Sequence, residues 1–253
     1  MSTIIGLDVG GTALKAATII DKEKIAARLT LPAGGDIARE ELARRIASCV
    51  KELSQDSPVK AVGLCFGGLL QDDGRMREGS TNLSNLDQVP LKEFFSQLLG
   101  LPCKVENDAI AAMMGEASFG AARGLKNAMT MTFGSGIGSG LLLDGRIHHG
   151  THRRAGEIGV WRLASPGGTG GWPSLEDLAA PARFFRQHGI ELAALLRGEN
   201  SEARVNIEPI LEGVGRAIAN AHLLLDLEAV ILTGAITALG EAFLNPIKFA
   251  YHA

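Results

Sequence analysis

The sequence predicts an α/β protein of two lobes. With 253 residues, of which 46% are hydrophobic, the chain can bury one large core or two smaller ones, and domains of roughly 100–150 residues make two the natural division. Strand-like runs alternate with segments of helical periodicity, which is typical of α/β proteins. A glycine-rich turn between two strand-like runs occurs once in each half. We therefore expect lobes at residues 1–107 and 108–253.

The first half begins with short apolar runs separated by turn residues, which indicates a β-meander. These runs are residues 3–9, 13–20 and 24–31. The helix that follows has Asp36 as its candidate N-cap. Its apolar residues Leu42, Ile46 and Val50 recur at helical spacing. The remaining segments predict a strand at 59–66, a long loop at 67–90, a helix at 91–99 and a strand at 102–107.

The second half predicts a similar mixture of strands and helices. Segment 205–225 is expected to be a long helix, because Ile210, Val214 and Ile218 share one face. After the glycine-rich stretch 155–177, a helix is expected to begin near Ser174. The other expected elements are a helix at 108–120, strands at 127–133, 139–147 and 229–233, and a helix at 239–250.

Charge and cysteine content exclude several classes of protein. The formal net charge is −3, so no basic excess exists to neutralise a phosphate backbone, and we expect no nucleic-acid partner. Cys49, Cys65 and Cys103 show no CxxC spacing, which indicates reduced, intracellular thiols. The N-terminal apolar run ends at Asp8 without the basic start of a signal peptide. No run reaches the roughly 18–20 apolar residues that cross a bilayer, so we expect a cytoplasmic protein without a membrane partner.

The two glycine turns share one pattern. "LDVGGTALKAATI" and "MTFGSGIGSGLLL" each contain a strand, a tight turn with a small hydroxyl residue, and a returning strand. Glycine lets successive backbone N–H groups approach an anion closely and form a phosphate-binding nest. A single glycine hairpin is most simply a turn. The repetition favours a pair of hairpins, at residues 10–12 and 134–136, that hold a polyphosphate from two sides.

Asp8 immediately precedes the first of these hairpins. A carboxylate beside bound phosphate is repulsive unless a cation lies between them, so Asp8 suggests Mg²⁺ held directly or through water. Neither hairpin is a Walker A loop, which requires GxxxxGK[ST]. Neither is a dinucleotide fingerprint, which requires GxGxxG at the start of a helix.

Several motifs in a fixed order resemble one known family. They are "GLDVGGTALKAA", "TNL", "VENDAIAAMMGE", "TFGSGIGSGLLLDGRIHHG" and "AGEIG". In this order and spacing they resemble the ROK family, the repressor and sugar-kinase group of the actin-like ATPase superfamily. The resemblance implies a two-lobed actin-like ATPase (ribonuclease H-like) α/β fold with nucleotide and sugar in the interlobe cleft. It implies a kinase that uses ATP and Mg²⁺ to phosphorylate a hydroxyl of a hexose or an N-acylhexosamine.

The resemblance also implies roles for particular residues. Asp108 matches the catalytic base, which takes the proton of the sugar hydroxyl that attacks the γ-phosphate. Asn107 and Asp108 are equally suited to cap the following helix, and both roles are compatible. The residues implied to contact the sugar are Gly68, Asn82, Asn107, Asp108, Glu157 and Glu176. The residues implied to contact the nucleotide are Gly10, Gly11, Thr12, Lys15, Gly134, Ser135, Gly136 and Gly234.

The sequence departs from the family pattern in the glycine-rich stretch. ROK kinases usually have a histidine and a cysteine cluster that bind a structural zinc ion, whereas this chain has Val160 at the histidine position and neither Cys nor His in 160–176. We expect a zinc-free loop in which Glu176 remains a sugar-binding carboxylate. Trp161 and Trp172 are expected to pack this loop. His149 and His152 are candidates for the missing hydroxyl contact, or else ordinary surface residues.

Two further features bear on activity. The resemblance begins at Thr3, which leaves no room for the DNA-binding segment of family repressors and favours a kinase. At the other end, Gly234 lacks its glycine neighbours, and relatives usually continue beyond the final "FAYHA". The alternative is therefore a catalytically weak or inactive ROK-type protein that binds sugar or regulates. Retention of Asp8, both hairpins and Asp108 favours the kinase, and the family implies a homo-oligomer, a dimer.

Overall fold

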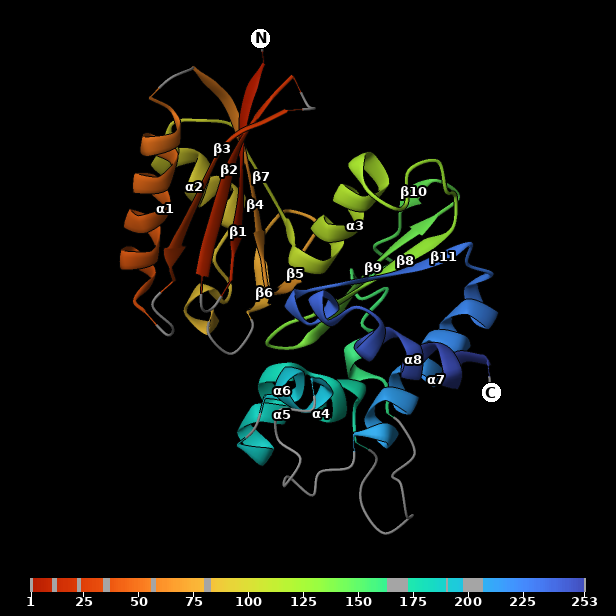
Figure 1. Ribbon diagram of the computed structural model, residues 1–253. Helices are drawn as coiled ribbons and strands as arrows, with labels where there is room; N and C mark the ends of the chain where they lie inside the picture. Colours follow the sequence, from red (N-terminus) through yellow and green to blue (C-terminus); the bar gives the residue numbers. More distant parts are fainter. Residues whose placement is uncertain are drawn as a thin grey trace. The chain divides into compact units, whose positions relative to one another are not determined.

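The computed structural model divides into two compact units, Met1–Ala111 and Ala112–Ala253 (Figure 1). It describes residues 2–10, 13–21, 24–33, 37–55, 58–79, 83–162, 173–189, 191–197 and 207–252. Each unit has its own β-sheet and its own cluster of buried hydrophobic residues. Among the described residues, no helix is both long and apolar enough to span a membrane.

The first unit contains a five-stranded sheet in the order β3-β2-β1-β4-β7. Its strands are β1 (Thr3–Val9), β2 (Ala13–Ile20), β3 (Lys24–Pro32), β4 (Val59–Phe66) and β7 (Cys103–Asn107). The expected meander is confirmed, because β1, β2 and β3 pair antiparallel in sequence order. Strands β4 and β7 run parallel to β1. The carboxyl ends of these three parallel strands therefore meet at one edge of the sheet.

The residues of β1 alternate between a buried face and a more accessible one. Ile5, Leu7 and Val9 are fully buried, whereas Asp8 lies on the opposite face. The registers pair Asp8 with Cys65 of β4, and Cys65 with Glu106 of β7. The polar residues near the strand ends therefore share the less buried face of the sheet.

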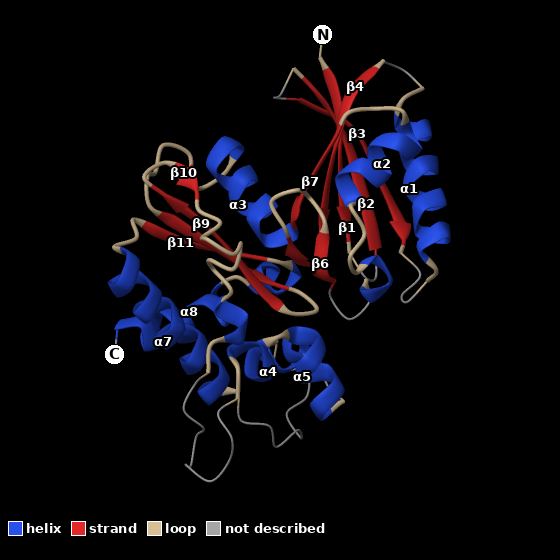
Figure 2. Cartoon of the chain, turned by 180° about the vertical axis from the view of Figure 1, so that it is seen from behind, coloured by secondary structure: helices blue, strands red, loops and turns tan. Residues whose placement is uncertain are grey.

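Two helices cover the buried face of this sheet, α1 (Arg39–Leu53) and α2 (Leu91–Leu99) (Figure 2). The expected N-cap of α1 at Asp36, which lies outside the described residues, is wrong: the helix begins at Arg39, and its N-cap is Ala38, which makes no side-chain hydrogen bond. Acidic Glu40 and Glu41 occupy the first helical turn. There they interact favourably with the positive end of the helix dipole, which stabilises the start without a capping side chain.

The expected long loop at 67–90 contains regular structure, so that expectation is wrong. A two-stranded sheet pairs β5 (Gly68–Leu70) with β6 (Met76–Gly79), and a short 3₁₀ helix follows at Ser84–Leu86. Leu70, Met76 and Leu86 are buried in the core of the first unit. These isolated apolar residues lie among turn-forming ones, so neither helical nor strand periodicity is visible in the sequence.

The second unit contains a four-stranded sheet in the order β10-β9-β8-β11. Its strands are β8 (Ala128–Phe133), β9 (Ile137–Leu143), β10 (Arg146–Ile147) and β11 (Ala229–Thr233). The single strand expected at 139–147 is divided into β9 and β10. Asp144 and Gly145 separate them with φ angles of 51° and 72°, a left-handed pair that suits a tight hairpin.

Helices pack on both faces of the second sheet. Helices α7 (Glu208–Leu225) and α8 (Glu241–His252) share a core with β8, in which Met131, Val214 and Ile247 are buried. Helix α3 (Asp108–Phe119) contributes Met113 to a separate small cluster with Leu142. The unit also contains the short helices α4 (Leu175–Ala179), α5 (Pro181–His188) and α6 (Leu192–Leu196) and the 3₁₀ helices at Ile158–Val160 and Ala235–Leu239.

Candidate functional site

Three groups gather where the parallel strands of the first unit end. Asp8 lies on β1, Cys65 lies opposite it on β4, and Asp108 is the first residue of α3, directly after β7. The Cys65 Sγ atom lies 3.9 Å from Asp8 Oδ1 and 3.5 Å from the Leu7 carbonyl oxygen. Asp108 retains solvent-accessible surface, although neighbouring protein removes much of its hydration. The strand ends therefore present two carboxylates around one partly buried thiol.

The surroundings change the acidity of two of these groups. Loss of hydration raises the pKa of Asp108 above its ordinary value, and the negative charge of Asp8 raises it further. The backbone N–H of Ala109, 2.8 Å from Asp108 Oδ1, partly opposes this increase in pKa. Burial first, and then the charges of Asp8 and Asp108, also raise the pKa of the Cys65 thiol. Cys65 is therefore a protonated thiol, and Asp108 is a stronger base than an ordinary carboxylate.

Asn107 connects the start of α3 to β5. Its Oδ1 accepts a hydrogen bond from the Ile110 N–H at 3.0 Å, which caps the helix. Its Nδ2 donates to the Gly68 carbonyl oxygen at 3.0 Å. Gly68 has a φ of 127°, a conformation that glycine adopts most readily. The capping interpretation of Asn107 is thus confirmed, and the same side chain links two residues expected to contact the sugar.

The first glycine hairpin is only partly described. The Gly10 N–H donates to the Ala13 carbonyl oxygen at 3.1 Å. Lys15 Nζ lies 3.8 Å from Asp8 Oδ2, and both side chains are substantially exposed. Gly11, Thr12 and Asn82 lie outside the described residues. A cation and a carboxylate therefore stand together on the strands that flank the expected phosphate hairpin.

The second glycine hairpin joins β8 to β9. The Gly134 N–H donates to the Gly136 carbonyl oxygen at 2.9 Å, and Gly134 and Ser135 are exposed. Gly234 follows β11 with a φ of 113°, and a side chain there would collide with the Phe133 carbonyl oxygen. Gly234 therefore lets the end of β11 lie against the end of β8. Gly234 thus lies beside Phe133, the residue that precedes the second hairpin, and the binding of one nucleotide by residues 134–136 and 234 stays a prediction.

Glu176 makes contacts that sequence reasoning did not anticipate. Its Oε2 accepts a hydrogen bond from the Ile137 N–H at 3.1 Å, immediately after the second hairpin. Its other oxygen, Oε1, forms an ion pair with Arg183 Nη2. Cβ atoms placed on Gly136 and Gly159 would lie 2.6 Å and 3.1 Å from Glu176 Oε2, so these glycines leave space for the carboxylate. Arg183 was not predicted from the sequence, although it follows Glu176 by seven residues, which is about two turns of an α-helix.

The helix expected to begin near Ser174 is α4, and Ser174 is its N-cap. Its Oγ accepts a hydrogen bond from the Asp177 N–H at 3.1 Å, and Asp177 Oδ2 accepts one from the Ser174 N–H at 3.0 Å. These reciprocal bonds form a capping box. They fix the first turn of α4, from which Glu176 projects toward the hairpin.

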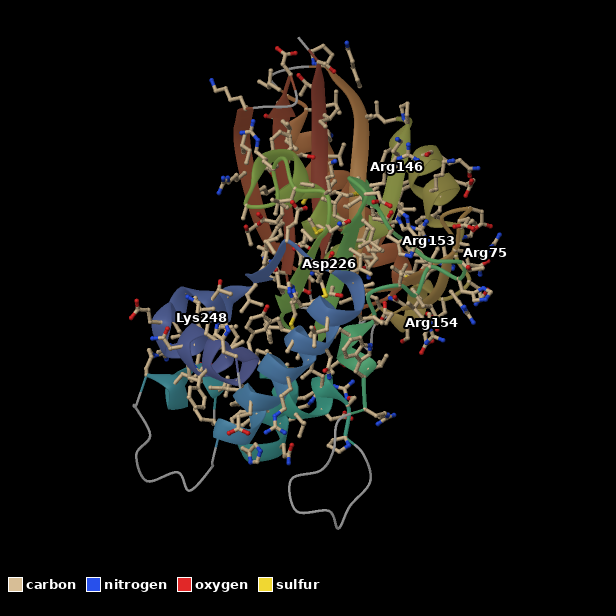
Figure 3. All side chains as sticks on the ribbon, turned by 90° about the vertical axis from the view of Figure 1, so that its right-hand side faces the viewer. Arg75, Arg146, Arg153, Arg154, Asp226 and Lys248 are labelled. Carbon is tan, nitrogen blue, oxygen red and sulfur yellow. The ribbon has the colours of Figure 1, made fainter. Side chains whose placement is uncertain are left out.

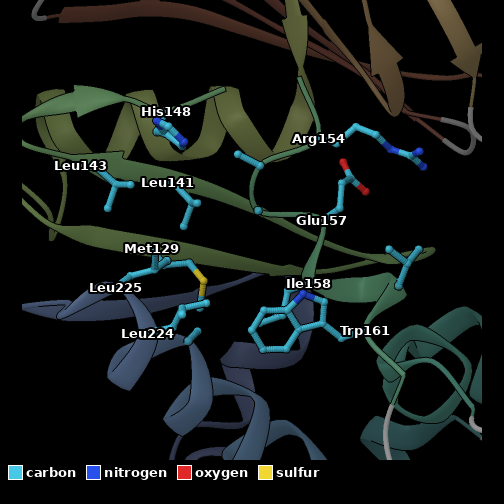
Figure 4. Close-up of a pocket in the computed structure, with 14 residues that line it drawn as sticks. Met129, Leu141, Leu143, His148, Arg154, Glu157, Ile158, Trp161, Leu224 and Leu225 are labelled. Atoms are coloured by element: carbon cyan, nitrogen blue, oxygen red, sulfur yellow. The ribbon is translucent and has the colours of Figure 1, made fainter. Parts of the chain in front are cut away.

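Glu157 borders an apolar cavity of about 460 Å³ in the second unit (Figure 4). Met129, Leu141 and Trp161 line its wall, and Arg154 lies at its rim beside Glu157. Arg154 belongs to a basic group along β10 and the loop after it, together with Arg146 and Arg153 (Figure 3). Trp161 is partly buried against the core of this unit, and its expected packing against the glycine-rich loop stays a prediction. Trp172 lies outside the described residues.

The expected histidine contacts receive no further support. His152 is exposed and His149 is partly buried, and the cavity is lined instead by the neighbouring His148. Val160, at the position where relatives have histidine, is 55% exposed. His149 accepts a backbone hydrogen bond from the Ala155 N–H at 3.1 Å, which shapes the loop before Glu157.

The arrangement of the donor groups bears on metal binding. Within the described part of the chain, no three His, Cys, Asp or Glu residues are arranged to hold a metal ion. Residues 163–172 of the expected zinc-free loop are not among those described, so that expectation stays a prediction. Mg²⁺ requires no such cluster, because it binds through one or two carboxylates and retains water and phosphate ligands. The exposed Asp8 carboxylate fits that pattern.

The family model for the ROK family matches residues 4–252. The chain belongs to the ROK family. It is 28% identical to a glucokinase of Halalkalibacterium halodurans, over 98% of this chain and 85% of that protein. It is 25% identical to an N-acetylmannosamine kinase of Salmonella typhi, over 97% of this chain and 87% of that protein. A ROK family glucokinase from Streptomyces griseus, solved in complex with glucose and AMPPNP, matches with a TM-score of 0.79 and 26% identity, covering 99% of this chain and 88% of that one.

Membership of the ROK family confirms the expected fold class. This ROK chain has the α/β fold of actin-like ATPases, with a mixed sheet in each of its two units. A division of the sequence after residue 107 stays a prediction, since the compact units meet at residues 111 and 112. The match extends through both glycine hairpins, the segment that contains Asp108 and the helices that follow.

Proposed function

We propose that this ROK protein is an ATP-dependent kinase that transfers the γ-phosphate to a hydroxyl of a hexose or an N-acylhexosamine. Its similarity to a glucokinase and to an N-acetylmannosamine kinase supports this substrate class. The observation that carries the proposal is the position of Asp108 at the end of β7, with its pKa raised by lost hydration and by Asp8. A protein that only binds sugar has no need of such a base.

In the proposed reaction Asp108 accepts the proton of the sugar hydroxyl. The hydroxyl oxygen forms a bond to the γ-phosphorus, the bond from that phosphorus to the β–γ bridging oxygen breaks, and ADP leaves. Phosphoryl transfer depends mainly on positioning and charge stabilisation, so one well-placed carboxylate is sufficient. The raised pKa of Asp108 suits this role, because it brings the affinity of the base for a proton closer to that required at neutral pH.

Asp8 is the proposed contact for Mg²⁺, directly or through a water molecule. When bound, Mg²⁺ would neutralise charge on the β- and γ-phosphates. Lys15 lies beside Asp8 and adds a positive charge for the same phosphates. The nucleotide is assigned to both hairpins and to Gly234, which packs against the end of β8.

The residues proposed to bind the sugar differ in the contacts that they already make within the protein. Asn107 holds the Gly68 carbonyl oxygen in place, and Glu157 borders the apolar cavity. These residues, together with Asn82 and Asp108, are proposed to bind the sugar hydroxyls. Glu176 is also proposed as an acceptor, because a carboxylate offers about four acceptor positions and can bind a hydroxyl while it contacts Ile137 and Arg183.

The engagement of Glu176 favours one alternative function. If the carboxylate, held by Ile137 and Arg183, does not reach the sugar, one hydroxyl contact is lost, and a weakly active or inactive sugar-binding protein becomes the second candidate. Measurement of ADP release with a panel of hexoses and N-acetylhexosamines separates the two. Sugar-dependent ADP release supports the kinase. Sugar binding by calorimetry without ADP release supports the alternative.

We also propose that the protein is a cytoplasmic homodimer. Its three cysteines are free, as expected in a reducing compartment. Leu223 and Leu224 of α7 are 80% and 74% exposed, and Val160 adjoins the same cavity as Leu224. Adjacent exposed apolar residues of this kind often mark a protein interface. Light scattering after gel filtration should show a dimer that the double substitution Leu223→Arg and Leu224→Arg converts to a monomer.

A further inference from the structure

Arg183 joins two acidic residues at the start of α4. Its guanidinium forms ion pairs with Glu176 Oε1 and with Asp177 Oδ1. Hydrogen bonds from Ser174, and then the charge of Arg183, lower the pKa of Asp177, so that this carboxyl stays ionised near neutral pH. Arg183 comes from α5, a helix separate from the one that holds both acids. It therefore fixes the position of the Glu176 side chain relative to its own helix.

The carboxylate of Glu176 in turn contacts the second glycine hairpin. The Ile137 N–H donates to it directly after residues 134–136. Gly136 and Gly159 have no side chains that would occupy the same space, and a Cβ atom on either would come within 3.1 Å of the carboxylate. The position of Glu176 and the position of the hairpin are therefore linked.

A carboxylate in this place would oppose the binding of an anion. Residues 134–136 are the proposed contact for the phosphates of ATP, and a negative charge immediately behind them repels phosphate. The guanidinium of Arg183 neutralises this charge through its ion pair with Glu176. It also holds the carboxylate where it can accept the Ile137 hydrogen bond.

We propose that Arg183 is a positioning residue for ATP, which acts by holding and neutralising Glu176 behind the hairpin of residues 134–136. This inference rests on the proposed kinase function. It adds a residue that does not contact the nucleotide itself and acts through the side chain of Glu176. The Arg183–Glu176 ion pair keeps the β8–β9 hairpin in a position, and with a local charge, that allow it to bind phosphate.

The test compares Arg183→Met, Arg183→Lys, Glu176→Gln and the double variant Arg183→Met/Glu176→Gln. Arg186→Met is the matched control, because Arg186 is an exposed basic residue on the same helix. KM for MgATP, KM for the sugar and kcat are measured at two salt concentrations. Calorimetry gives the affinity for AMPPNP, and thermal unfolding identifies any variant that does not fold.

Arg183→Met should raise KM for MgATP roughly 10- to 100-fold, the range expected for one charge-assisted contact, while KM for the sugar changes less. The Glu176 side chain is 21% exposed, so added salt should partly screen its charge and reduce this defect. Arg183→Lys should retain most of the wild-type affinity. In the Glu176→Gln background, Arg183→Met should have only a small effect, because no charge is left to neutralise.

An unchanged KM and AMPPNP affinity in Arg183→Met, or an equal loss in both backgrounds, would overturn the inference. If Arg183→Met does not fold, Arg183→Lys and the double variant decide by the same comparison. A wild-type protein that binds AMPPNP but releases no ADP with any sugar would instead contradict the proposed kinase function. In that case the calorimetric comparison of the variants still decides the role of Arg183.

Discussion

Asp108 is the residue on which the proposed chemistry depends most directly. Its neighbours Asn107 and Ala109 provide a fixed start to α3, and the loss of hydration keeps its carboxyl more basic than usual. Substitution by asparagine preserves the shape of the side chain and removes its ability to accept a proton. The structural and catalytic roles of this position are therefore separable by experiment.

We expect Asp108→Asn to lower kcat by about 10²- to 10⁴-fold, the usual contribution of a general base. Sugar affinity should fall much less, because the amide still forms hydrogen bonds. Asp144→Asn is the control: Asp144 lies in the exposed turn between β9 and β10 with a φ of 51°, which asparagine tolerates. Steady-state kinetics and calorimetry provide the measurement. A folded Asp108→Asn protein with normal turnover would remove Asp108 from the mechanism.

The raised pKa of Asp108 predicts the direction of a pH effect. A general base must be deprotonated, so kcat/KM should fall as the pH decreases through the pKa of Asp108. Because lost hydration and Asp8 raise that pKa above the ordinary value of 3.8, the decline should begin at a higher pH than for an exposed aspartate. Initial rates across a pH series at saturating Mg²⁺ give the profile. Constant activity down to about pH 4 would contradict this environment for Asp108.

At the scale of elements, the β8–β9 hairpin depends on the absence of a side chain at Gly136. A methyl group there would lie 2.6 Å from Glu176 Oε2, so either the hairpin or the carboxylate must move. Gly115 of α3 offers a contrast, since a methyl group there meets nothing within 4 Å. Substitution by alanine is therefore expected to lower the stability of the protein at Gly136 and to raise it at Gly115.

Gly136→Ala should destabilise the protein by about 1–3 kcal/mol through overpacking and should raise KM for MgATP. Gly115→Ala should stabilise it by about 0.5–1 kcal/mol, because alanine loses less backbone entropy in a helix. Urea unfolding and steady-state kinetics of both variants provide the comparison. Equal stability and equal KM in the two variants would show that Glu176 does not occupy the space behind Gly136.

Individual elements also show where sequence patterns are sufficient. The strand expected at residues 3–9 and the helix expected to begin near Ser174 depend on a few neighbouring positions, and both appear in the structure where expected. The hairpin of β5 and β6 was missed because its buried residues Leu70 and Met76 are isolated among turn residues. Asp36 fits a capping pattern equally well, but α1 begins only at Arg39. A short stretch of sequence indicates that a helix N-cap is possible, but it does not decide at which of several neighbouring residues the helix begins.

At the scale of the whole molecule, the zinc content of the protein tests the expectation that the loop of residues 160–176 binds no zinc. The absence of Cys and His from residues 160–176 predicts that purified protein contains no stoichiometric zinc. A zinc-selective chelator should leave the thermal midpoint and the activity unchanged, because no metal-coupled folding energy is present to lose. Elemental analysis and thermal unfolding with and without chelator measure this. One equivalent of tightly bound zinc per chain would contradict it.

The order of most strands and helices, the two glycine hairpins and the family resemblance can be predicted from the amino-acid sequence alone. These features depend on residue types at short and regular spacings, which set local conformation and can be recognised without a fold. Three other features become visible only in the folded chain: Asp8 and Cys65 adjoin Asp108, Arg183 holds Glu176, and Gly136 leaves space for that carboxylate. Hydration and charge at a site depend on side chains distant in sequence, and packing alone brings these side chains within range of one another.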